Sequence, residues 1–307
     1  MTVAPVCVFA FRRPEHTRQT LAALSASPLA DQTPLTVFVD GPRDDRDVEP
    51  VRQVIDIAKA QRGFASLNVI ARDENAGLAT SIQDGVTRMM SDHGRAIVVE
   101  DDIVTSPAFL SYMNAALTAY SDCENVGSVS GYMETIPGLP ESFFSRKGTS
   151  WGWASWRRVW QRVNWDGERL LRELEDLNLS YELDFGSAAG FSNMLKDQVA
   201  GRNDSWAIRF YVWNFLNGML HLNPGESLVQ NIGHDGSGTH CAKSDRYSTA
   251  LAQHAPKIDM RMQVIEDMGA YETISEHLRE QHGNFGEAHR RRGLVRRLAK
   301  IIRGKLA

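Results

Sequence analysis

Cysteine and long hydrophobic runs are scarce in this sequence of 307 residues. Its three cysteines are Cys7, Cys123 and Cys241. They are too few and too dispersed for a disulfide framework or a zinc site, and they favour a reducing compartment. The apolar run at residues 3–11 is too short to span a membrane, and it precedes Arg12 and Arg13, the reverse of a signal peptide. We therefore expect a cytoplasmic protein.

An excess of positive charge is also missing from most of the chain. The net charge is -4, but residues 290–305 hold eight Lys or Arg and no acid, which leaves -12 for the remainder. This distribution argues against a nucleic-acid partner.

The basic C-terminal segment needs a separate interpretation. Its apolar residues, including Leu294, Leu298 and Ile302, fall near one side of a helix. A basic amphipathic helix predicts that residues 290–307 contact an anionic membrane surface, such as the inner face of the plasma membrane. A disordered basic tail, or a helix bound to an acidic partner, is the alternative.

What the sequence does contain is a regular alternation of apolar strands and amphipathic helices. Strands are predicted at residues 3–11, 35–39, 67–71 and 96–99, each followed by a helix, beginning at Pro14 and then covering 47–61, 78–90 and 107–120. This pattern predicts an α/β fold with a mostly parallel sheet flanked by helices. Beyond residue 120 the alternation stops, with one further strand predicted at 126–130 and helices at 155–163, 168–177 and 205–216.

Every strand of the repeated units ends in polar residues. Arg12 and Arg13 follow the first strand, Asp40 and Gly41 the second, residues 72–77 the third, and Glu100, Asp101 and Asp102 the fourth. Parallel sheets bind ligands beyond the carboxyl ends of their strands, so these residues predict one shared nucleotide crevice.

Three consecutive carboxylates follow the fourth strand, in residues 100–102. Like charges a few Å apart repel strongly, so a compensating charge is expected. A divalent cation such as Mg²⁺ or Mn²⁺ binds one or two carboxylates and completes its shell with phosphate oxygens and water. The alternative is a solvated loop whose acids point outward.

These motifs resemble a known family along most of the chain. Residues 97–104 and 107–112 are similar to the Glu-Asp-Asp signature of the N-acetylglucosaminyltransferase I family, which has the GT-A (Rossmann-like) fold, and of related bacterial cell-surface polysaccharide glycosyltransferases. Further similarities lie at residues 11–14, 150–156 and 203–206, and at Asp40 and His240.

The resemblance implies an inverting, metal-dependent transferase that uses a UDP-sugar, with UDP-GlcNAc as the family's suggestion. Asp102 would bind the metal, and His240 would bind either the metal or a phosphate oxygen. Glu100 and Asp101 would contact sugar and ribose. Arg13 and Asp40 would contact the nucleobase, because a carboxylate accepts from uracil N3–H. The acceptor would be a glycan or lipid-linked glycan in cell-surface polysaccharide or lipopolysaccharide synthesis.

Other residues have two interpretations each. Asn75, Gly77 and Leu78 lead into the third helix, whose amides either bind an anionic ligand or simply begin the helix. Trp151 and Trp153 either stack on an acceptor sugar or pack in the core.

Inversion requires a general base. Asp204 is the candidate, followed by Asp184 and Glu134, and the alternative role of Asp204 is an N-cap for the helix after it.

We expect residues 1–130 to form the nucleotide-sugar half of one GT-A domain, residues 131–245 the acceptor and catalytic half, and residues 246–307 a helical extension. Two other functions remain open. A sugar-phosphate nucleotidyltransferase normally has a Gly-rich loop after its first strand, and residues 11–15 contain no glycine. A catalytically silent glycan- or membrane-binding module would have lost its metal site.

Overall fold

A computed structural model describes residues 3–236, 249–258 and 263–282. The strands are β1 (Val6–Ala10), β2 (Pro34–Val39), β3 (Ser66–Ala71), β4 (Arg95–Glu100), β5 (Ile103–Thr105), β6 (Val126–Ser130), β7 (Ser142–Ser145), β8 (Trp153–Trp156), β9 (Leu220–Pro224) and β10 (Val229–Asn231). The helices are α1 (Pro14–Ser25), α2 (Asp45–Ala60), α3 (Leu78–His93), α4 (Phe109–Ala119), α5 (Arg157–Trp160), α6 (Gly167–Asp176), α7 (Ser180–Leu183), α8 (Phe191–Val199), α9 (Trp206–Leu216) and α10 (Met268–His282), with a 3-10 turn η1 at Ala30–Gln32.

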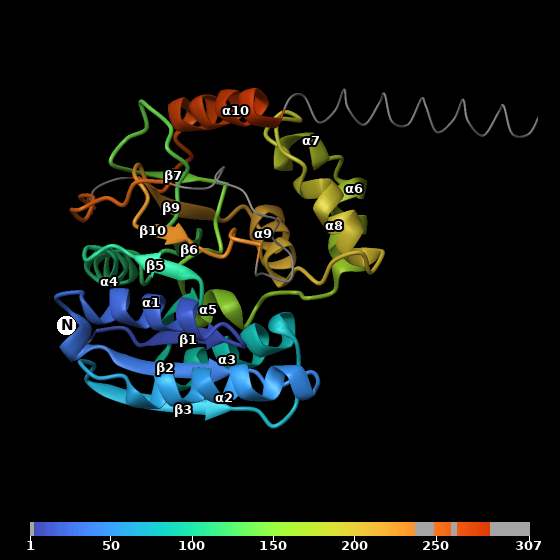
Figure 1. The fold of residues 1–307 in the computed structure, drawn as a ribbon. Helices are drawn as coiled ribbons and strands as arrows, with labels where there is room; N and C mark the ends of the chain where they lie inside the picture. The colour runs from blue at the N-terminus through green and yellow to red at the C-terminus, as the bar shows by residue number, and fades with distance from the viewer. Residues whose placement is uncertain (1–2, 237–248, 259–262, 283–307) are drawn as a thin grey trace, which may run out of the picture.

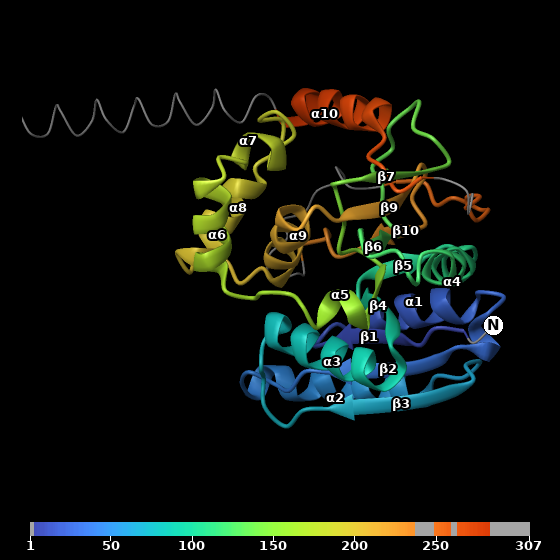
Figure 2. The same cartoon turned by 180° about the vertical axis from the view of Figure 1, so that it is seen from behind.

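The central sheet has eight strands in the order β3-β2-β1-β4-β8-β6-β9-β7. The pairs β3–β2, β2–β1, β1–β4 and β6–β9 are parallel, and β8 and β7 run antiparallel to their neighbours. Helices α1 and α2 cover one face of the sheet, and α3 covers the other (Figures 1 and 2). The predicted α/β fold with a mostly parallel sheet flanked by helices is therefore confirmed.

The first four β-α units form as the sequence predicts. Helix α1 begins at Pro14, whose fixed φ suits the first helical turn, and it buries Leu21 and Leu24. Helix α3 begins after Gly77, at φ 81°, and ends at Gly94, at φ 77°, where a left-handed residue terminates the helix. These boundaries leave the carboxyl ends of β1 to β4 along one edge of the sheet.

The order of the strands reverses between β1 and β4. Phe9 of β1 lies opposite Glu100 of β4 in parallel register. At such a switch point the connections that follow neighbouring strands lead to opposite faces of the sheet and leave a crevice between them. The segment after β1 and the acidic segment after β4 both border this crevice.

The helix predicted at residues 155–163 is confirmed only for the four residues of α5, Arg157–Trp160. Trp153 to Trp156 form β8, which pairs with β4 on one side and β6 on the other. The strand is buried on both faces, so its hydrophobicity carries no period that would separate a strand from a helix. Only the short α5 follows it.

Two cores form in the described part of the chain. The main core joins residues of β1 to β4 with β8 and α9, so residues before and after 130 share it. A smaller cluster, including Met133, Phe185 and Ile274, connects the segment before β7 with α10. Helices α6, α7 and α8 stand beside α9, and α10 lies at the opposite end from β3 (Figure 1). Among the described helices, none combines the length and the apolar character needed to cross a bilayer.

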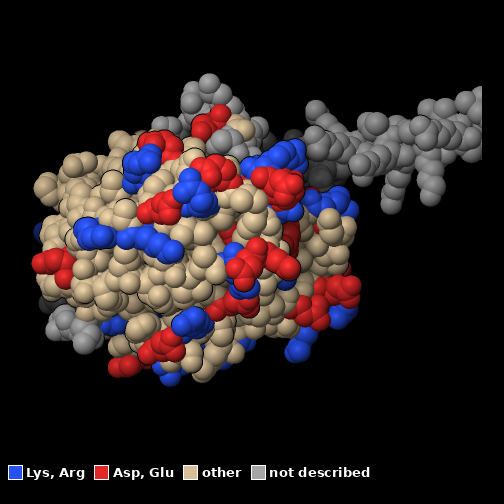
Figure 3. Space-filling model, turned by 60° about the horizontal axis from the view of Figure 1, so that its bottom comes forward, with Lys and Arg blue, Asp and Glu red and all other residues tan. Residues whose placement is uncertain are grey.

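Charges on the surface are mixed in sign. On the face shown in Figure 3, acidic and basic side chains are interspersed. Many pair along a helix, as Arg52 does with Glu49 and Asp56 in α2. His240 and the basic segment 290–307 lie outside the described residues, so their predicted roles stay predictions.

Candidate active site

An arginine from the first strand's loop meets the acidic cluster at the switch point. The guanidinium of Arg13 forms a short ion pair with Asp101 and a second one, of 2.9 Å, with Asp102. The backbone N–H of Phe11 also donates to Asp101, at 3.3 Å. Thr20 of α1 holds the Asp101 carbonyl from the other side, at 2.8 Å. Arg13 therefore provides part of the compensating charge that the acidic triplet requires.

The compensation by Arg13 is incomplete. Burial, and then the charges of Asp102 and Asp101, raise the pKa of Glu100 to about 8. Burial also raises the pKa of Asp101, although Arg13 opposes that shift. With a pKa of about 8, Glu100 is largely protonated at neutral pH, so the one guanidinium faces the carboxylates of Asp101 and Asp102. A cation bound beside them would favour the ionised form of Glu100.

The segment after β10 is held against the acidic cluster. Strand β10 pairs antiparallel with β5, which places Asn231 opposite Ile103. Ile232 then donates its N–H to the Asp102 carbonyl at 2.8 Å. Gly233 approaches the Asp102 carboxylate so closely that a Cβ there would lie 2.1 Å from Oδ2. Only glycine fits this position without displacing Asp102.

The acidic cluster is compatible with a divalent cation that takes one oxygen ligand from Asp102. Among the described residues, no three His, Cys, Asp or Glu side chains converge into a ready-made metal cage. Mg²⁺ and Mn²⁺ do not need one, since they bind through one or two carboxylates and take other ligands from phosphates and water. Asp102 supplies a hard oxygen ligand in a region of excess negative charge, so the residues present are compatible with such an ion.

Asp40 organises the turn that leads into α3. Its two carboxylate oxygens accept from the N–H groups of Gly41, Ala76 and Gly77 and from Asn75 Nδ2, at 2.9 to 3.1 Å. These four bonds fill the acceptor positions of the carboxylate. Leu78, the first residue of α3, is 45% exposed. The structure thus brings Asp40, Asn75 and Gly77 together, as predicted for one rim, and a cavity of about 260 Å³ borders Asp40.

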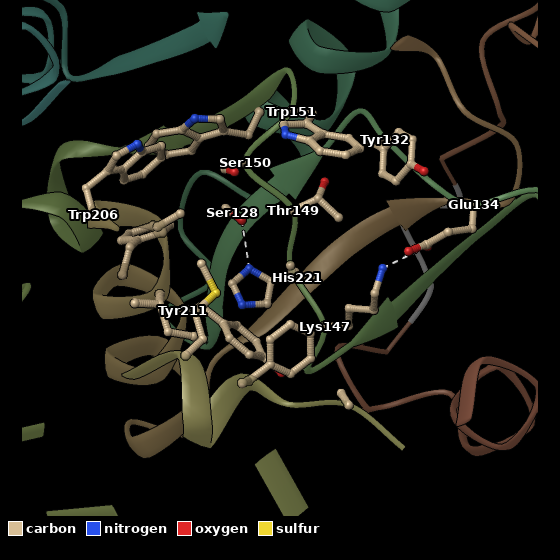
Figure 4. A pocket seen from close by; sticks show the side chains of 18 of the residues that line it. Ser128, Tyr132, Glu134, Lys147, Thr149, Ser150, Trp151, Trp206, Tyr211 and His221 are labelled. Atoms are coloured by element: carbon tan, nitrogen blue, oxygen red, sulfur yellow. Dashed lines mark hydrogen bonds and ion pairs between the residues drawn. The ribbon is translucent and has the colours of Figure 1, made fainter. Parts of the chain in front are cut away.

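A larger cavity of about 510 Å³ is lined by residues from 128 onward and by none of the acidic cluster. Its wall includes Trp151 and His234, whose rings meet edge to face with centroids 5.5 Å apart. His234 follows Gly233 directly, so one loop contacts Asp102 and also lines the cavity. Figure 4 shows Trp151, Trp206, Tyr211 and His221 around this space.

The two tryptophans predicted to bind acceptor occupy different environments. Trp151 is half-buried and lines the cavity beside Tyr132. Trp153 is 1% exposed, and its ring packs against Trp206 and Phe210 at centroid distances of 5.4 and 5.2 Å. Trp153 therefore belongs to the core as well as to the cavity wall, as a large aromatic residue commonly does.

The three candidate bases also differ in position. Asp204 has a 70% exposed carboxylate, 3.6 Å from Arg209. The alternative role of Asp204 as an N-cap is wrong, because Ser205 caps α9 by accepting from the Ile208 N–H at 3.2 Å. Asp184 accepts two hydrogen bonds from Ser192 at the start of α8.

Glu134 is the candidate base that lines the large cavity. It pairs with Lys147 at 2.9 Å. Burial would raise the pKa of Glu134, but the Lys147 ammonium lowers it below its ordinary value. Glu134 is therefore ionised at neutral pH.

Sequence reasoning missed the residues at the centre of the cavity, above all His221. This residue lies on β9, where Leu220 to Pro224 alternate apolar and polar residues. Such alternation predicts a strand with its polar side in water. His221 and Asn223 are instead 1% and 0% exposed, because β9 is covered on both faces. The alternation in residues 220–224 therefore predicts a strand, but it does not indicate a functional site.

Burial of His221 predicts an acid-sensitive contribution to stability. Desolvation lowers its pKa from 6.5 to about 4. The unfolded chain therefore binds more protons between these values, and the stabilisation present above pH 6.5 is lost as pH falls through 4. We expect wild type to lose up to about 3 kcal/mol over this range relative to His221→Asn. Urea unfolding at several pH values measures the difference, with His93→Asn at the exposed end of α3 as the control. Equal pH slopes in wild type and His221→Asn would contradict the assignment.

Comparisons with known proteins give distant similarities only. No protein-family model matches the chain, and no curated protein matches it in sequence. Part of the chain is similar to glucosyl-3-phosphoglycerate synthase from Mycobacterium tuberculosis in complex with Mn²⁺, UDP and glucosyl-3-phosphoglycerate, with a TM-score of 0.31 and 14% identity over 57% of this chain and 67% of that one. A crystal structure of a mycobacterial protein is similar with a TM-score of 0.30 and 14% identity, over 50% of this chain and 54% of that one.

Proposed function

We propose that this chain is a metal-dependent glycosyltransferase that moves a sugar from a nucleotide-sugar to an acceptor hydroxyl. One observation carries the proposal: the loop after β10 contacts the acidic cluster through Gly233 and lines the aromatic cavity through His234. A site for a metal-bound diphosphate and a site for an acceptor would then be immediate neighbours. Sugar transfer needs this proximity, because the acceptor hydroxyl must approach the anomeric carbon of the bound donor.

Each residue of the acidic cluster has a proposed role. Asp102 would bind the divalent cation, which supplies Lewis-acid stabilisation of charge on the departing diphosphate. Arg13 would hold Asp101 and Asp102 in place. Glu100 and Asp101 would accept hydrogen bonds from sugar and ribose hydroxyls.

The donor would be a UDP-sugar, with UDP-GlcNAc suggested by the family that the motifs resemble. Its nucleoside would lie near Asp40 and Arg13. Asn75, Gly77 and Leu78 would border the anionic part of the donor, with the Gly77 N–H and Asn75 Nδ2 already donating to Asp40. The Asp40 carboxylate already accepts four hydrogen bonds from the turn before α3. To accept one from uracil N3–H, it would have to give up one of these four.

The acceptor would be a glycan or a lipid-linked glycan of a bacterial cell-surface polysaccharide, bound beside Trp151 in the large cavity. An acceptor attached to a membrane lipid would suit the proposed contact of residues 290–307 with an anionic membrane surface and a peripheral location there.

The general base is proposed to be Asp204, with Glu134 as the competitor favoured by its place in the cavity wall. We expect Asp204→Asn to lower kcat by about 10² to 10⁴ while donor binding is unchanged, because a base acts on the acceptor proton alone. Initial rates and UDP affinity would be measured for Asp204→Asn and Glu134→Gln side by side. A large loss in Glu134→Gln with normal activity in Asp204→Asn would transfer the role to Glu134.

The proposed function is tested by thermal unfolding with nucleotides and metal. A ligand that binds only the folded state raises Tm, so UDP with Mn²⁺ should raise it more than either alone. A larger shift with CTP or ATP would favour the nucleotidyltransferase instead. No shift with any nucleotide would reject both enzymatic functions and leave the silent binding module.

A further inference from the structure

Four polar side-chain atoms in the wall of the large cavity lack a hydrogen-bond partner among the described residues. They are Thr149 Oγ1, Trp153 Nε1, Tyr211 Oη and His221 Nε2. The four residues come from β8, β9, α9 and the segment before β8, so four parts of the chain line one space, and the four atoms are covered while it is empty. A buried polar atom without a partner is costly, and a ligand with hydrogen-bonding groups would remove that cost.

His221 is held rigidly within this group. Its Nδ1 shares a 2.7 Å hydrogen bond with Ser128 Oγ, which leaves Nε2 as the atom without a partner (Figure 4). Gly148 lies against the ring so closely that a Cβ there would lie 2.8 Å from it. The ring of Tyr211 lies on another side, with centroids 6.2 Å apart. The imidazole is therefore positioned before any ligand binds.

The remaining wall is mostly aromatic and carries no net charge. Trp151, Phe191, Trp206 and Phe210 contribute apolar ring surface. Glu134 and Lys147 are the ionic residues of the wall among those described, and their 2.9 Å pair neutralises both charges (Figure 4). A charged ligand would find no free counter-ion here, and burying an unpaired charge is strongly unfavourable.

We infer that this cavity binds an uncharged sugar ring of the acceptor, with the Tyr211 hydroxyl and His221 Nε2 as specificity-determining contacts to its hydroxyl groups. The inference rests on the proposed function, since it names the substrate class of the proposed acceptor site. A pyranose ring presents apolar C–H faces to aromatic rings and hydroxyls at its edge, which matches both parts of the wall. A purely apolar ligand would leave all four polar atoms buried without partners.

Tyr211→Phe tests the inference with little disturbance of the fold. The substitution removes only a hydroxyl that bonds to nothing in the described protein, so Tm should stay the same or rise. Tyr112→Phe is the matched control, because Tyr112 is 1% exposed, lies on α4 outside the cavity, and also has an unpartnered hydroxyl. Both variants should show similar Tm, and only Tyr211→Phe should lose affinity for the sugar.

The probes are methyl glycosides of neutral hexoses and N-acetylhexosamines, methyl glucuronide as a charged analogue, and octanol as an apolar one. Binding is followed by tryptophan fluorescence, because Trp151 and Trp206 line the cavity. At least one neutral glycoside should bind more tightly than methyl glucuronide and octanol, and Tyr211→Phe should weaken it roughly five- to tenfold. Tighter binding of glucuronide or octanol, no binding of any neutral glycoside, or equal affinity in Tyr211→Phe would overturn the inference.

The same samples separate this inference from the proposed function. The Tm shift with UDP and Mn²⁺ reports on the acidic cluster and does not need an acceptor. Glycoside binding without that shift would reject the donor site alone. The shift without glycoside binding would reject the acceptor class alone.

Discussion

Asp102→Asn is expected to lower kcat by about 10³ or more and to abolish the part of the UDP-induced rise in Tm that depends on Mn²⁺. An amide has the size of the carboxylate but lacks its charge, so the direct metal contact would be lost together with its stabilisation of the diphosphate. Metal assistance contributes several kcal/mol in such reactions, and about 4 kcal/mol corresponds to this change in rate. Initial rates at varied Mn²⁺ and Tm with UDP measure the two effects.

The fold should survive this change. The Asp102 carbonyl still accepts from Ile232, and Arg13 still has Asp101 as a partner. Asp92→Asn, an exposed site on α3, is the control for loss of one acidic charge. If Asp102→Asn keeps Mn²⁺-dependent activity within about threefold of wild type, Asp102 is not the metal ligand.

Arg13→Met is expected to lower the free energy of unfolding by about 3 kcal/mol at neutral pH and without metal. Asp101 has a side chain only 4% exposed, and removing one partner of a buried ion pair leaves an uncompensated charge. Mn²⁺ should restore part of the lost stability, because it provides a second source of positive charge beside the same carboxylates. Urea unfolding with Mn²⁺, and with NaCl at equal ionic strength, measures this recovery.

Arg12→Met is the matched control, since Arg12 is the neighbouring residue and also forms an ion pair. Its side chain is 39% exposed, and its partner Asp47 keeps a second arginine, Arg43, at 3.0 Å. We expect a loss below about 1 kcal/mol and no recovery with Mn²⁺. An equal loss in both variants would show that Arg13 has no special role in the cluster.

The loop after β10 explains why the candidate site could not be read from local sequence alone. Gly233 is fixed against Asp102 by the β5–β10 pair and by its own N–H, which donates to Asn231 Oδ1 at 2.8 Å. Two short strands separated by more than a hundred residues form that contact. Neither strand is long enough to give a periodic signal.

The alternation of apolar strands and amphipathic helices was sufficient to predict β1 to β4 and their helices, the parallel sheet, and the edge at which Arg13, Asp40 and Glu100 to Asp102 gather. Local hydrophobic period and short connections determine those features, so they are present in the sequence itself. The insertion of β8 beside β4, the burial of His221 and the neutral aromatic cavity were decided only by tertiary structure. They depend on which distant segments pack together. Strand β8 is buried on both faces and shows no period, and the alternation in β9 predicts a polar face in water that tertiary packing covers.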